Sequence, residues 1–314
     1  MNKQLRCMLV LLMLITLYVL YSLYTLVHLR VLLNWATGRR NVPRCNLHLN
    51  ILSARQNFDE RNTVRKTWGK TFPRYHFFVG NQSCTSQSTL LNPITCAPVR
   101  FAPRSVSLED LHLQSRMSSI LEEEIKWEAT ELHDVVLLPM TDSFHNLAQK
   151  LLLTWEWTIR NVPQSSMIIT LNDDIDESVV WQISRKVCDV LEIFDWESHG
   201  ENVIVGTIIT DFVQRTGKYA DLHYQNESWW WAQWPPFPRG GNGYAVSTKL
   251  AKLVLEHKEM LPTTSGDDTS VGLWLQELET RHNVSIKWVQ TGEKVPLWMS
   301  FVYHCMVIMY NAAA

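Results

Sequence analysis

The clearest candidate for chemistry is a run of carboxylates that directly follows an apolar segment. Residues 167–171 are apolar or β-branched, and Asn172-Asp173-Asp174-Ile175-Asp176 comes next. A buried strand that ends in acids presents them at the edge of a sheet, and carboxylate oxygens are hard ligands for Mg²⁺ or Mn²⁺. A metal held there could neutralise a bound diphosphate. The competing interpretation is a helix N-terminus, where aspartate caps backbone amides and complements the helix dipole.

A second acid pair, Asp267-Asp268, precedes the apolar stretch 273–278. Its spacing favours the first turn of a helix, where acids are common. The functional alternative is a general base that accepts the proton of an attacking hydroxyl, which requires closeness to the reacting carbon.

An aromatic segment is the third candidate. Trp229, Trp230, Trp231 and Trp234 stand immediately before a proline- and glycine-rich stretch, 235–244. Such a stretch forms a shaped loop, and indole faces on it could stack on sugars, although core packing of some of the four is the simpler interpretation. His304 is isolated, and a lone histidine is more often packed or on the surface than a ligand.

Alternating short elements would position these residues. Strands are predicted at 47–52, 76–79, 135–138, 167–171 and 203–209. Helices are predicted at 107–130, 146–160, 177–194 and 248–257. This order favours an α/β sheet with helices on its faces and a ligand beyond the carboxyl ends of the strands.

The N-terminus predicts a membrane anchor. Residues 7–27 are 21 consecutive uncharged, mostly apolar residues, enough for one helical crossing of a bilayer. The run is longer than that of a cleaved signal peptide and lacks a small-residue cleavage site. A short tail, 1–6, would precede the anchor, a basic stem, 28–44, would follow it, and the folded body would begin near residue 45. Basic residues flank both ends of the anchor, so the positive-inside rule does not decide its orientation.

Three N-glycosylation acceptor triplets favour a lumenal or extracellular body. They begin at Asn81, Asn226 and Asn283, and none has proline in the middle position.

Charge excludes one class of partner. Six of the 29 Lys and Arg residues lie in 1–44 and none of the 31 acids does, so the body carries a formal charge of −8. A body that acidic is a poor nucleic-acid binder.

The cysteines predict a disulfide rather than a metal cluster. Beyond Cys7 in the anchor there are five, among which Cys84 and Cys96 are the preferred pair. No pair has the close C-x-x-C spacing of a zinc site, and the common hydrolase, metalloprotease and phosphate-loop motifs are absent from the sequence.

Six blocks in order resemble the β-1,3-glycosyltransferase family, the galactosyl- and N-acetylglucosaminyltransferases of glycosyltransferase family 31. Residues 61–69 resemble its R-x-x-x-R-x-T-W-G block, 77–80 its next strand, and 133–136 and 142–150 its D-I-I and D-S-Y-x-N-L-x-x-K blocks. Asn172-Asp173-Asp174 falls on its D-x-D metal motif, and 267–272 on its E-D-V-x-x-G. The resemblance covers most of residues 48–305.

The resemblance implies a type II Golgi membrane protein whose lumenal catalytic domain, 45–314, has a GT-A fold with a mixed central sheet, uses a UDP-sugar and binds Mn²⁺, with Mg²⁺ as a substitute. Asp268 would be the catalytic base, and Asp174 a metal ligand with His304 as a second ligand. Around the UDP the resemblance places Arg61, Arg65, Lys150 and Asp173. In the loop bordering donor and acceptor sugars it places Trp234, Gly241, Gly243 and Tyr244.

The family pattern is not matched throughout. Asn172 and Asp267 replace the usual aspartate and glutamate, and Pro238-Arg239 stand where cysteine and serine are common. From the resemblance as a whole we expect an inverting transferase that moves galactose or N-acetylglucosamine from UDP to the 3-hydroxyl of an acceptor glycan on protein or lipid. The alternatives are a catalytically silent, membrane-anchored glycan-binding protein of the same fold, and the same chemistry with glucose, glucuronate or N-acetylgalactosamine as the donor sugar.

Overall fold

The computed structural model describes Ser22, Cys45, Cys96 and residues 47–72, 74–84, 108–193, 201–211, 234–264 and 266–291. The chain divides into two units, Met1–Pro43 and Arg44–Ala314, and the elements discussed below all belong to the second. No helix within the described residues is long and apolar enough to cross a bilayer. Apart from Ser22, the expected anchor lies outside the described residues, as do Asn226 and His304.

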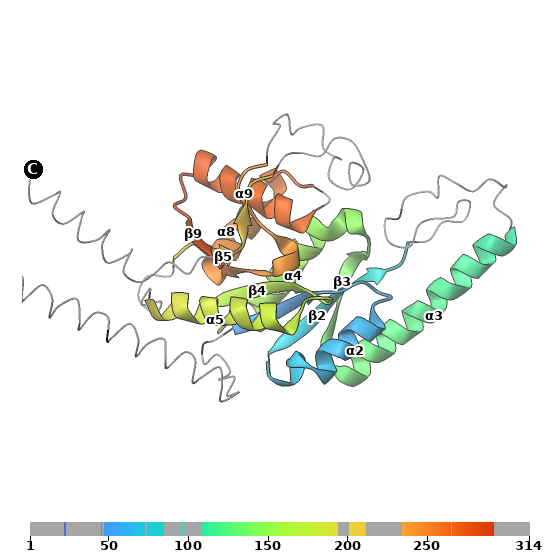
Figure 1. Cartoon of the computed structure of the whole chain (residues 1–314). Coiled ribbons are helices and arrows are strands. Elements are labelled where there is room, and N and C mark those ends of the chain that lie inside the picture. The colour runs from blue at the N-terminus through green and yellow to red at the C-terminus, as the bar shows by residue number, and fades with distance from the viewer. Residues whose placement is uncertain are drawn as a thin grey trace, which may run out of the picture. The chain divides into compact units, whose positions relative to one another are not determined.

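A mixed seven-stranded sheet forms the centre of the second unit, in the order β3-β2-β1-β4-β8-β5-β9 (Figure 1). Its strands are β1 (Leu47–Leu52), β2 (Tyr75–Gln82), β3 (Val135–Thr141), β4 (Met167–Asn172), β5 (Val203–Gly206), β8 (Tyr244–Ser247) and β9 (Lys287–Gln290). The first four are parallel, and β8 pairs antiparallel with both β4 and β5. The chain moves outward from β1 in both directions, so the switch point of the topology lies between β1 and β4.

Helices cover both faces of this sheet. One face packs against α4 (Leu147–Asn161), α8 (Thr248–His257) and α9 (Asp267–Arg281). The other packs against α2 (Phe58–Lys66), the 3₁₀ turn η1 (Trp68–Lys70) and α5 (Glu177–Ile193). The long α3 (Leu108–Leu132) runs beside the edge strand β3. Short connections complete the unit: β6 (Ile208–Ile209), β7 (Phe237–Pro238), η2 (Phe144–Asn146), η3 (Gly240–Asn242) and η4 (Lys258–Met260).

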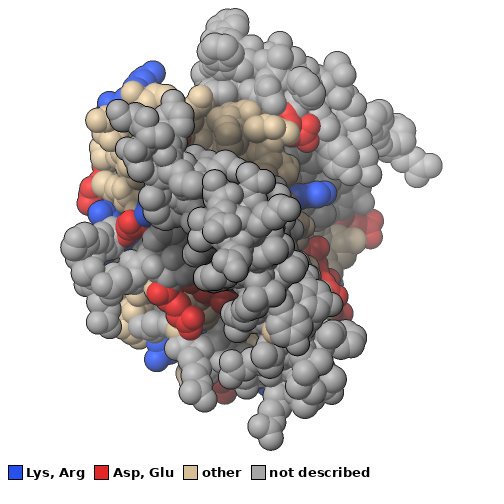
Figure 2. All heavy atoms as spheres, turned by 60° about the vertical axis from the view of Figure 1, so that its left-hand side comes forward, with Lys and Arg blue, Asp and Glu red and all other residues tan. Residues whose placement is uncertain are grey.

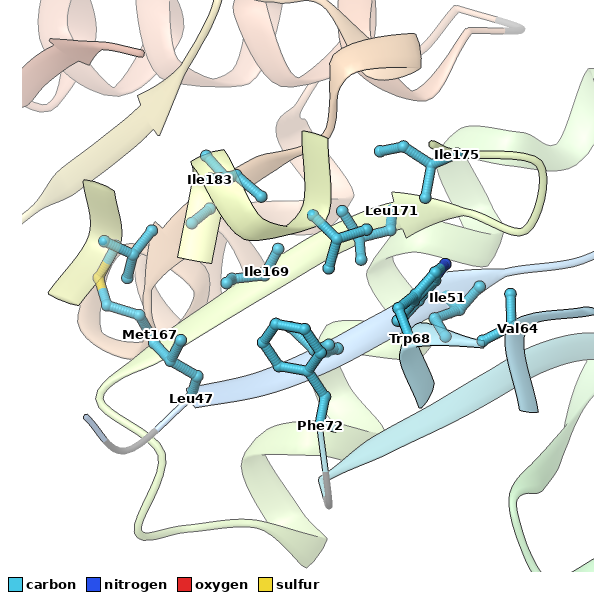
Figure 3. Close-up of a cluster of buried hydrophobic side chains, with 14 of the residues drawn as sticks. Leu47, Ile51, Val64, Trp68, Phe72, Met167, Ile169, Leu171, Ile175 and Ile183 are labelled. Atoms are coloured by element: carbon cyan, nitrogen blue, oxygen red, sulfur yellow. The ribbon is translucent and has the colours of Figure 1, made fainter. Parts of the chain in front are cut away.

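Alternation along the central strands explains the two cores. In β4 the odd-numbered side chains, such as Ile169 and Leu171, face α5, and Ile168 faces α4 and α8. Figure 3 shows the first of these clusters, in which Trp68 and Phe72 lie against β1 and β4. Because β4 is buried on both faces, it is a nearly continuous apolar run in the sequence.

The predicted α/β class and mixed sheet agree with the structure, which fits a GT-A-like fold. All five predicted strand segments and all four helices are present, although 203–209 contains two strands, β5 and β6, in place of one. The elements that were not predicted include α2, β7, β8 and β9, whereas α9 confirms the helix start that the Asp267-Asp268 pair favoured. The Cys84–Cys96 disulfide is confirmed, and a second, Cys45–Cys188, ties the start of β1 to α5.

Candidate active site

A pocket of about 220 Å³ lies at the switch point, beyond the carboxyl ends of the parallel strands. It is lined by Leu52, Ser53, Ala54, Gln56 and Asn57 after β1, by Asp142, Ser143, Phe144, Leu147 and Lys150 after β3, and by Asn172, Asp173 and Asp174 after β4. Open α/β sheets bind ligands in this position. The first acid cluster of the sequence therefore opens into a pocket.

Asp173 and Asp174 differ in their surroundings. The Asp173 side chain is buried and accepts a hydrogen bond from Asn57 Nδ2 at 3.0 Å, whereas Asp174 is exposed. Burial raises the pKa of Asp173, hydrogen bonds from Ser53 and Asn57 oppose that rise, and the charge of Asp174 adds to it. Asp173 is thus fixed by protein partners and Asp174 faces the pocket opening.

The two interpretations of the acid cluster apply to different residues. Asp176 is the helix-capping acid, since its Oδ1 accepts the Ser178 backbone N–H at 2.7 Å at the start of α5. Hydrogen bonding to the Ser178 side chain and to its backbone N–H lowers the pKa of Asp176. Asp173 and Asp174 stand before the helix and line the pocket.

Lys150 and Asp142 form a buried ion pair in the pocket wall. Lys150 Nζ lies 2.7 Å from Asp142 Oδ1 and donates a second bond, at 2.6 Å, to the Ser53 carbonyl oxygen. The second carboxylate oxygen, Asp142 Oδ2, is buried and has no partner among the described residues. A buried acceptor without a partner is costly, so a ligand N–H or O–H in the pocket would satisfy it.

Arg61 and Arg65, expected around the UDP, do not line the pocket. Arg61 is fully buried, and its N–H groups donate to Glu128, Ser53 Oγ and the carbonyl oxygens of Ala54 and Arg55. No N–H of Arg61 is left for a nucleotide, because the guanidinium has five and all five are used. The expected direct contact is therefore replaced by support of Ser53 and Ala54 in the pocket wall.

Arg65 is engaged in the same way. It forms a two-pronged ion pair with Asp134, with both N···O distances at 2.7 Å, and a 2.6 Å bond to Glu128. These bonds link α2 to α3 and to the start of β3. The two arginines are regularly spaced on α2, and the sequence alone does not distinguish an arginine that binds phosphate from one that binds buried acids.

Asp268 lies at the start of α9 and is held by backbone amides. Its Oδ2 accepts the Gly240 N–H at 3.1 Å and its Oδ1 accepts the Thr269 N–H at 2.7 Å. Each oxygen keeps a further lone pair that could take a proton. The helix-cap interpretation is partly right, since both acids stand in the first turn of α9, but Asp268 also bonds across to η3.

Asp267 has a different partner. The hydroxyl of the fully buried Tyr244 donates to Asp267 Oδ2 over a long 3.5 Å. Burial and the adjacent charge of Asp268 raise the pKa of Asp267 to about 7. The acid pair therefore retains a proton in mildly acidic solution and loses it around neutral pH.

The loop predicted to border the sugars splits into buried and exposed parts. Trp234 and Tyr244 are buried, Trp234 against Phe237 and Leu273, so neither presents an open aromatic face and both support the loop from inside. Gly241 is exposed. Gly243 has φ +65°, and a side chain there would meet Leu171 at 2.6 Å, so glycine is required.

The two described glycosylation acceptors also differ. Asn283 is exposed just after α9 at φ 52°, and its Ser285 is exposed too. Asn81 lies within β2 and is partly buried.

One side chain of the pocket, the carboxylate of Asp174, suits a divalent cation. Asp174 is an exposed carboxylate for which no hydrogen bond or ion pair is present within the described residues, and oxygen donors suit Mn²⁺ or Mg²⁺. The described part of the chain contains no group of three or more His, Cys, Asp or Glu that could hold a metal. Asp174 thus offers one carboxylate to a divalent cation, and the cation's other ligands would have to come from water or a bound substrate.

Sequence reasoning did not single out three pocket residues, Ser53, Asn57 and Asp142. Ser53 and Asn57 follow β1 in a stretch without a motif, whereas Asp142 opens the 142–150 block and could have been named from it.

Outside the pocket, the largest group of buried and partly buried charges described above is that of Arg61, Arg65, Glu128 and Asp134, which neutralise one another. On the face drawn in Figure 2, the described acidic and basic side chains are scattered among uncharged ones. Among the described residues, carboxylate oxygens in the pocket and at the start of α9 keep free acceptor capacity.

A mixed α/β sheet with an acid-lined pocket at its switch point is the arrangement of proteins that bind a ligand beyond the strand ends. Comparison with known proteins adds the family. The galactosyltransferase profile matches residues 112–285, which include Asp142, Lys150, Asp174 and Asp268. The chain belongs to this family, and within it to glycosyltransferase family 31.

Similar curated proteins carry related names. The UDP-GalNAc:beta-1,3-N-acetylgalactosaminyltransferase 2 of Xenopus laevis is 26% identical over 64% of this chain and 37% of its own length. The lactosylceramide 1,3-N-acetyl-beta-D-glucosaminyltransferase of Rattus norvegicus is 26% identical over 72% of this chain and 53% of its own. The hydroxyproline O-galactosyltransferase GALT2 of Arabidopsis thaliana is 24% identical over 85% and 32%. The chain thus spans between about a third and about half of the length of these relatives.

Proposed function

We propose that this chain is an inverting β-1,3-hexosyltransferase that moves galactose or N-acetylglucosamine from a UDP-sugar to the 3-hydroxyl of an acceptor glycan on protein or lipid. The observation that carries the proposal is the pocket at the β1/β4 switch point, in which Asp173, Asp174 and Lys150 meet. Family membership and the names of the relatives support the reaction class.

The donor nucleotide would occupy the switch-point pocket. Asp142 Oδ2, the buried oxygen without a partner among the described residues, offers an acceptor for an N–H or O–H of the nucleoside. Asp174 would bind Mn²⁺, which supplies Lewis-acid stabilisation of the diphosphate charge when bound. Arg61 and Lys150 hold Ser53 and Ala54 in place and keep the pocket wall rigid.

Asp268 would act as the base. It takes the proton of the acceptor 3-hydroxyl while that oxygen attacks the anomeric carbon, and the bond from that carbon to the diphosphate breaks and releases UDP. The Gly240 and Thr269 amides fix the carboxylate and leave lone pairs to receive the proton. One displacement inverts the anomeric carbon, so the second carboxylate of a retaining mechanism is not needed.

The membrane setting belongs to the same proposal. We expect a single-pass type II protein of the Golgi membrane with the anchor at 7–27, glycosylated at Asn81, Asn226 and Asn283. Of the two acceptors within the described residues, the exposed Asn283 is more accessible than the partly buried Asn81.

The test is UDP release by the full chain in detergent with Mn²⁺. Donors would be UDP-galactose, UDP-N-acetylglucosamine, UDP-N-acetylgalactosamine, UDP-glucose and UDP-glucuronate, each with and without a mixed glycan acceptor set. Acceptor-dependent release from a single donor supports a transferase and identifies its sugar.

The matched variants are Asp268→Asn and Asp176→Asn. Asp268→Asn should abolish transfer and retain UDP binding, whereas Asp176→Asn should leave turnover nearly unchanged. Full turnover in Asp268→Asn would remove Asp268 from the base role. A folded wild-type protein that binds glycans and releases no UDP from any donor would instead favour the silent glycan-binding protein.

A further inference from the structure

Exposed apolar side chains are concentrated on one helix. Six large apolar side chains are exposed among the described residues, and five of them lie on α3: Leu113, Met117, Ile120, Trp127 and Leu132. Trp127 is 62% exposed and Leu113 59%. An apolar patch of this kind on a folded protein usually marks an interaction surface.

Four of these side chains form one stripe. Leu113, Met117, Ile120 and Trp127 are separated by four, three and seven residues, which places them on one side of a helix with the spacing of a helix-pairing seam. We refer to these four residues as the α3 stripe.

A different side of α3 already contacts the body. Ile125 is fully buried, Glu128 pairs with Arg61 and Arg65, and Glu122 pairs with Arg55. Figure 1 shows that the first turns of α3 extend away from the sheet. The α3 stripe is therefore not needed to attach the helix, and its apolar side chains are left for another contact.

The charges beside the α3 stripe indicate what would cover it. Arg116 lies before the midpoint of the stripe and Glu123 and Glu124 lie after it, and all three are exposed. None of the three has a hydrogen bond or ion pair to another described residue in the structure. Acids outnumber bases along α3, so neither an anionic lipid surface nor a parallel copy of α3 suits it, and a partner must place its acids beside Arg116.

A second copy of α3 in antiparallel orientation satisfies these charges. In a parallel pair Arg116 would face Arg116, and the glutamates would face one another. In an antiparallel pair with a two-fold axis near Ile120, Arg116 of each copy lies beside Glu123 and Glu124 of the other. The same axis places Ile120 against its symmetry mate and Leu113 opposite Trp127, as a two-fold dimer requires, and it brings the exposed Glu109 and Glu131 of the two copies together at the ends of the paired segment.

We propose that this protein forms a homodimer in which the α3 stripe packs antiparallel against the α3 stripe of a second copy, about a two-fold axis near Ile120. This pairing uses no residue of the switch-point pocket, so it is independent of the proposed transfer reaction.

The first test is oxidative cross-linking of the full chain in detergent, in a Cys7→Ser, Cys305→Ser background. Ile120→Cys lies on the proposed axis and should give a disulfide-linked dimer of twice the 36.5 kDa chain mass. Ser115→Cys is the matched control, since it is exposed on the same helix but points away from the stripe. Equal cross-linking of the two variants, or none with Ile120→Cys, would overturn the proposal.

The second test is charge reversal, measured by sedimentation equilibrium of the same detergent-solubilised chain. Arg116→Glu and Glu124→Arg should each weaken the dimer by about tenfold, because attraction becomes repulsion at two symmetric positions. Their combination should restore the wild-type dissociation constant. An unchanged dissociation constant in both single variants, or a monomeric wild type at tens of micromolar, would contradict the pairing.

A third variant separates this surface from any other route to a dimer. Ile120→Glu places a charge on the axis and should give a monomer with an unchanged melting temperature, because its side chain is 43% exposed. A dimer that persists in Ile120→Glu would show that another surface joins the copies and would overturn the proposal.

Discussion

The acids after β4 and the acids that begin α9 are held by different means. Asp173 is fixed by side chains from the β1 end, and the adjacent pocket wall is fixed by the Lys150–Asp142 ion pair. Asp268 is fixed by two backbone amides, one of them from the glycine-rich turn η3. The first region therefore depends on buried charge, whereas the second depends on the close approach of a backbone.

The two regions are built for different proposed tasks, binding of a diphosphate after β4 and acceptance of a proton at the start of α9. In the proposed reaction, the diphosphate site needs an open carboxylate supported by a charge-balanced wall, and Asp174 and Lys150 would supply them. A base needs a carboxylate that is oriented and still able to accept a proton, and backbone amides orient it without neutralising it.

The largest expected effect is at Asp174. Asp174→Asn should lower Mn²⁺-dependent transfer about 10²- to 10³-fold, because a charged group that stabilises the departing diphosphate is lost. Asp176→Asn, two positions away, keeps a side-chain oxygen that can accept the Ser178 N–H and should leave both stability and transfer nearly unchanged. The measurement is UDP release against Mn²⁺ concentration for both variants, and an equal loss of activity in the two would refute the division of roles.

Lys150 should affect stability more than any residue near Asp268. Lys150→Met leaves the buried Asp142 carboxylate without its cation, and we expect a loss of about 3–5 kcal/mol in the free energy of unfolding. Urea unfolding measures it. The double variant Lys150→Met, Asp142→Leu removes both charges and should recover most of that stability. A double variant as unstable as the single one would mean that the ion pair itself, rather than the unpaired charge, accounts for the loss.

The two regions also differ in how far the sequence predicts them. Apart from α2, which was missed, the parallel part follows from local pattern: short apolar runs, the helices between them, and acids where β4 ends. Strand β8 was missed because four residues after Gly243 carry too little periodicity to separate a strand from the end of a loop. The start of α9 was predicted from its acid pair, but its extent was not, because residues 269–275 are all buried and show no single apolar stripe.

Site roles were predicted unevenly for a related reason. The pocket position of Lys150, Asp173 and Asp174 follows from the order of strands and motifs. Arg61 was placed around the nucleotide although its partner is Glu128, 67 residues away on α3, and a contact between distant elements leaves no local pattern. The Gly240 contact to Asp268 is hidden in the same way.

The acids at the start of α9 should make the free energy of unfolding depend on pH through Asp267. Its pKa, about 7 in the folded protein, lies above the usual value of 3.8, so between these values the folded state holds a proton that the unfolded state has lost. Stability should therefore fall as pH rises from 4 to 7, with a slope of up to about 1.4 kcal/mol per pH unit. Asp267→Asn should remove this slope, and the exposed Asp59→Asn should not. Urea unfolding at a series of pH values checks it, and an unaltered slope in Asp267→Asn would assign the titration elsewhere.

The smallest expected effect tests the backbone contact at Asp268. A methyl group on Gly240 would lie 3.3 Å from Asp268 Oδ2, closer than ordinary contact, whereas one on Gly241 meets nothing within 4 Å. We expect Gly240→Ala to lower kcat about tenfold by shifting the carboxylate, with the KM for the UDP-sugar unchanged, because a small displacement of a catalytic group is costly. Gly241→Ala should leave both constants as they are. Equal kcat values in the two alanine variants would mean that η3 does not orient Asp268, and a raised KM for the donor in Gly240→Ala would mean that η3 contacts the nucleotide-sugar itself.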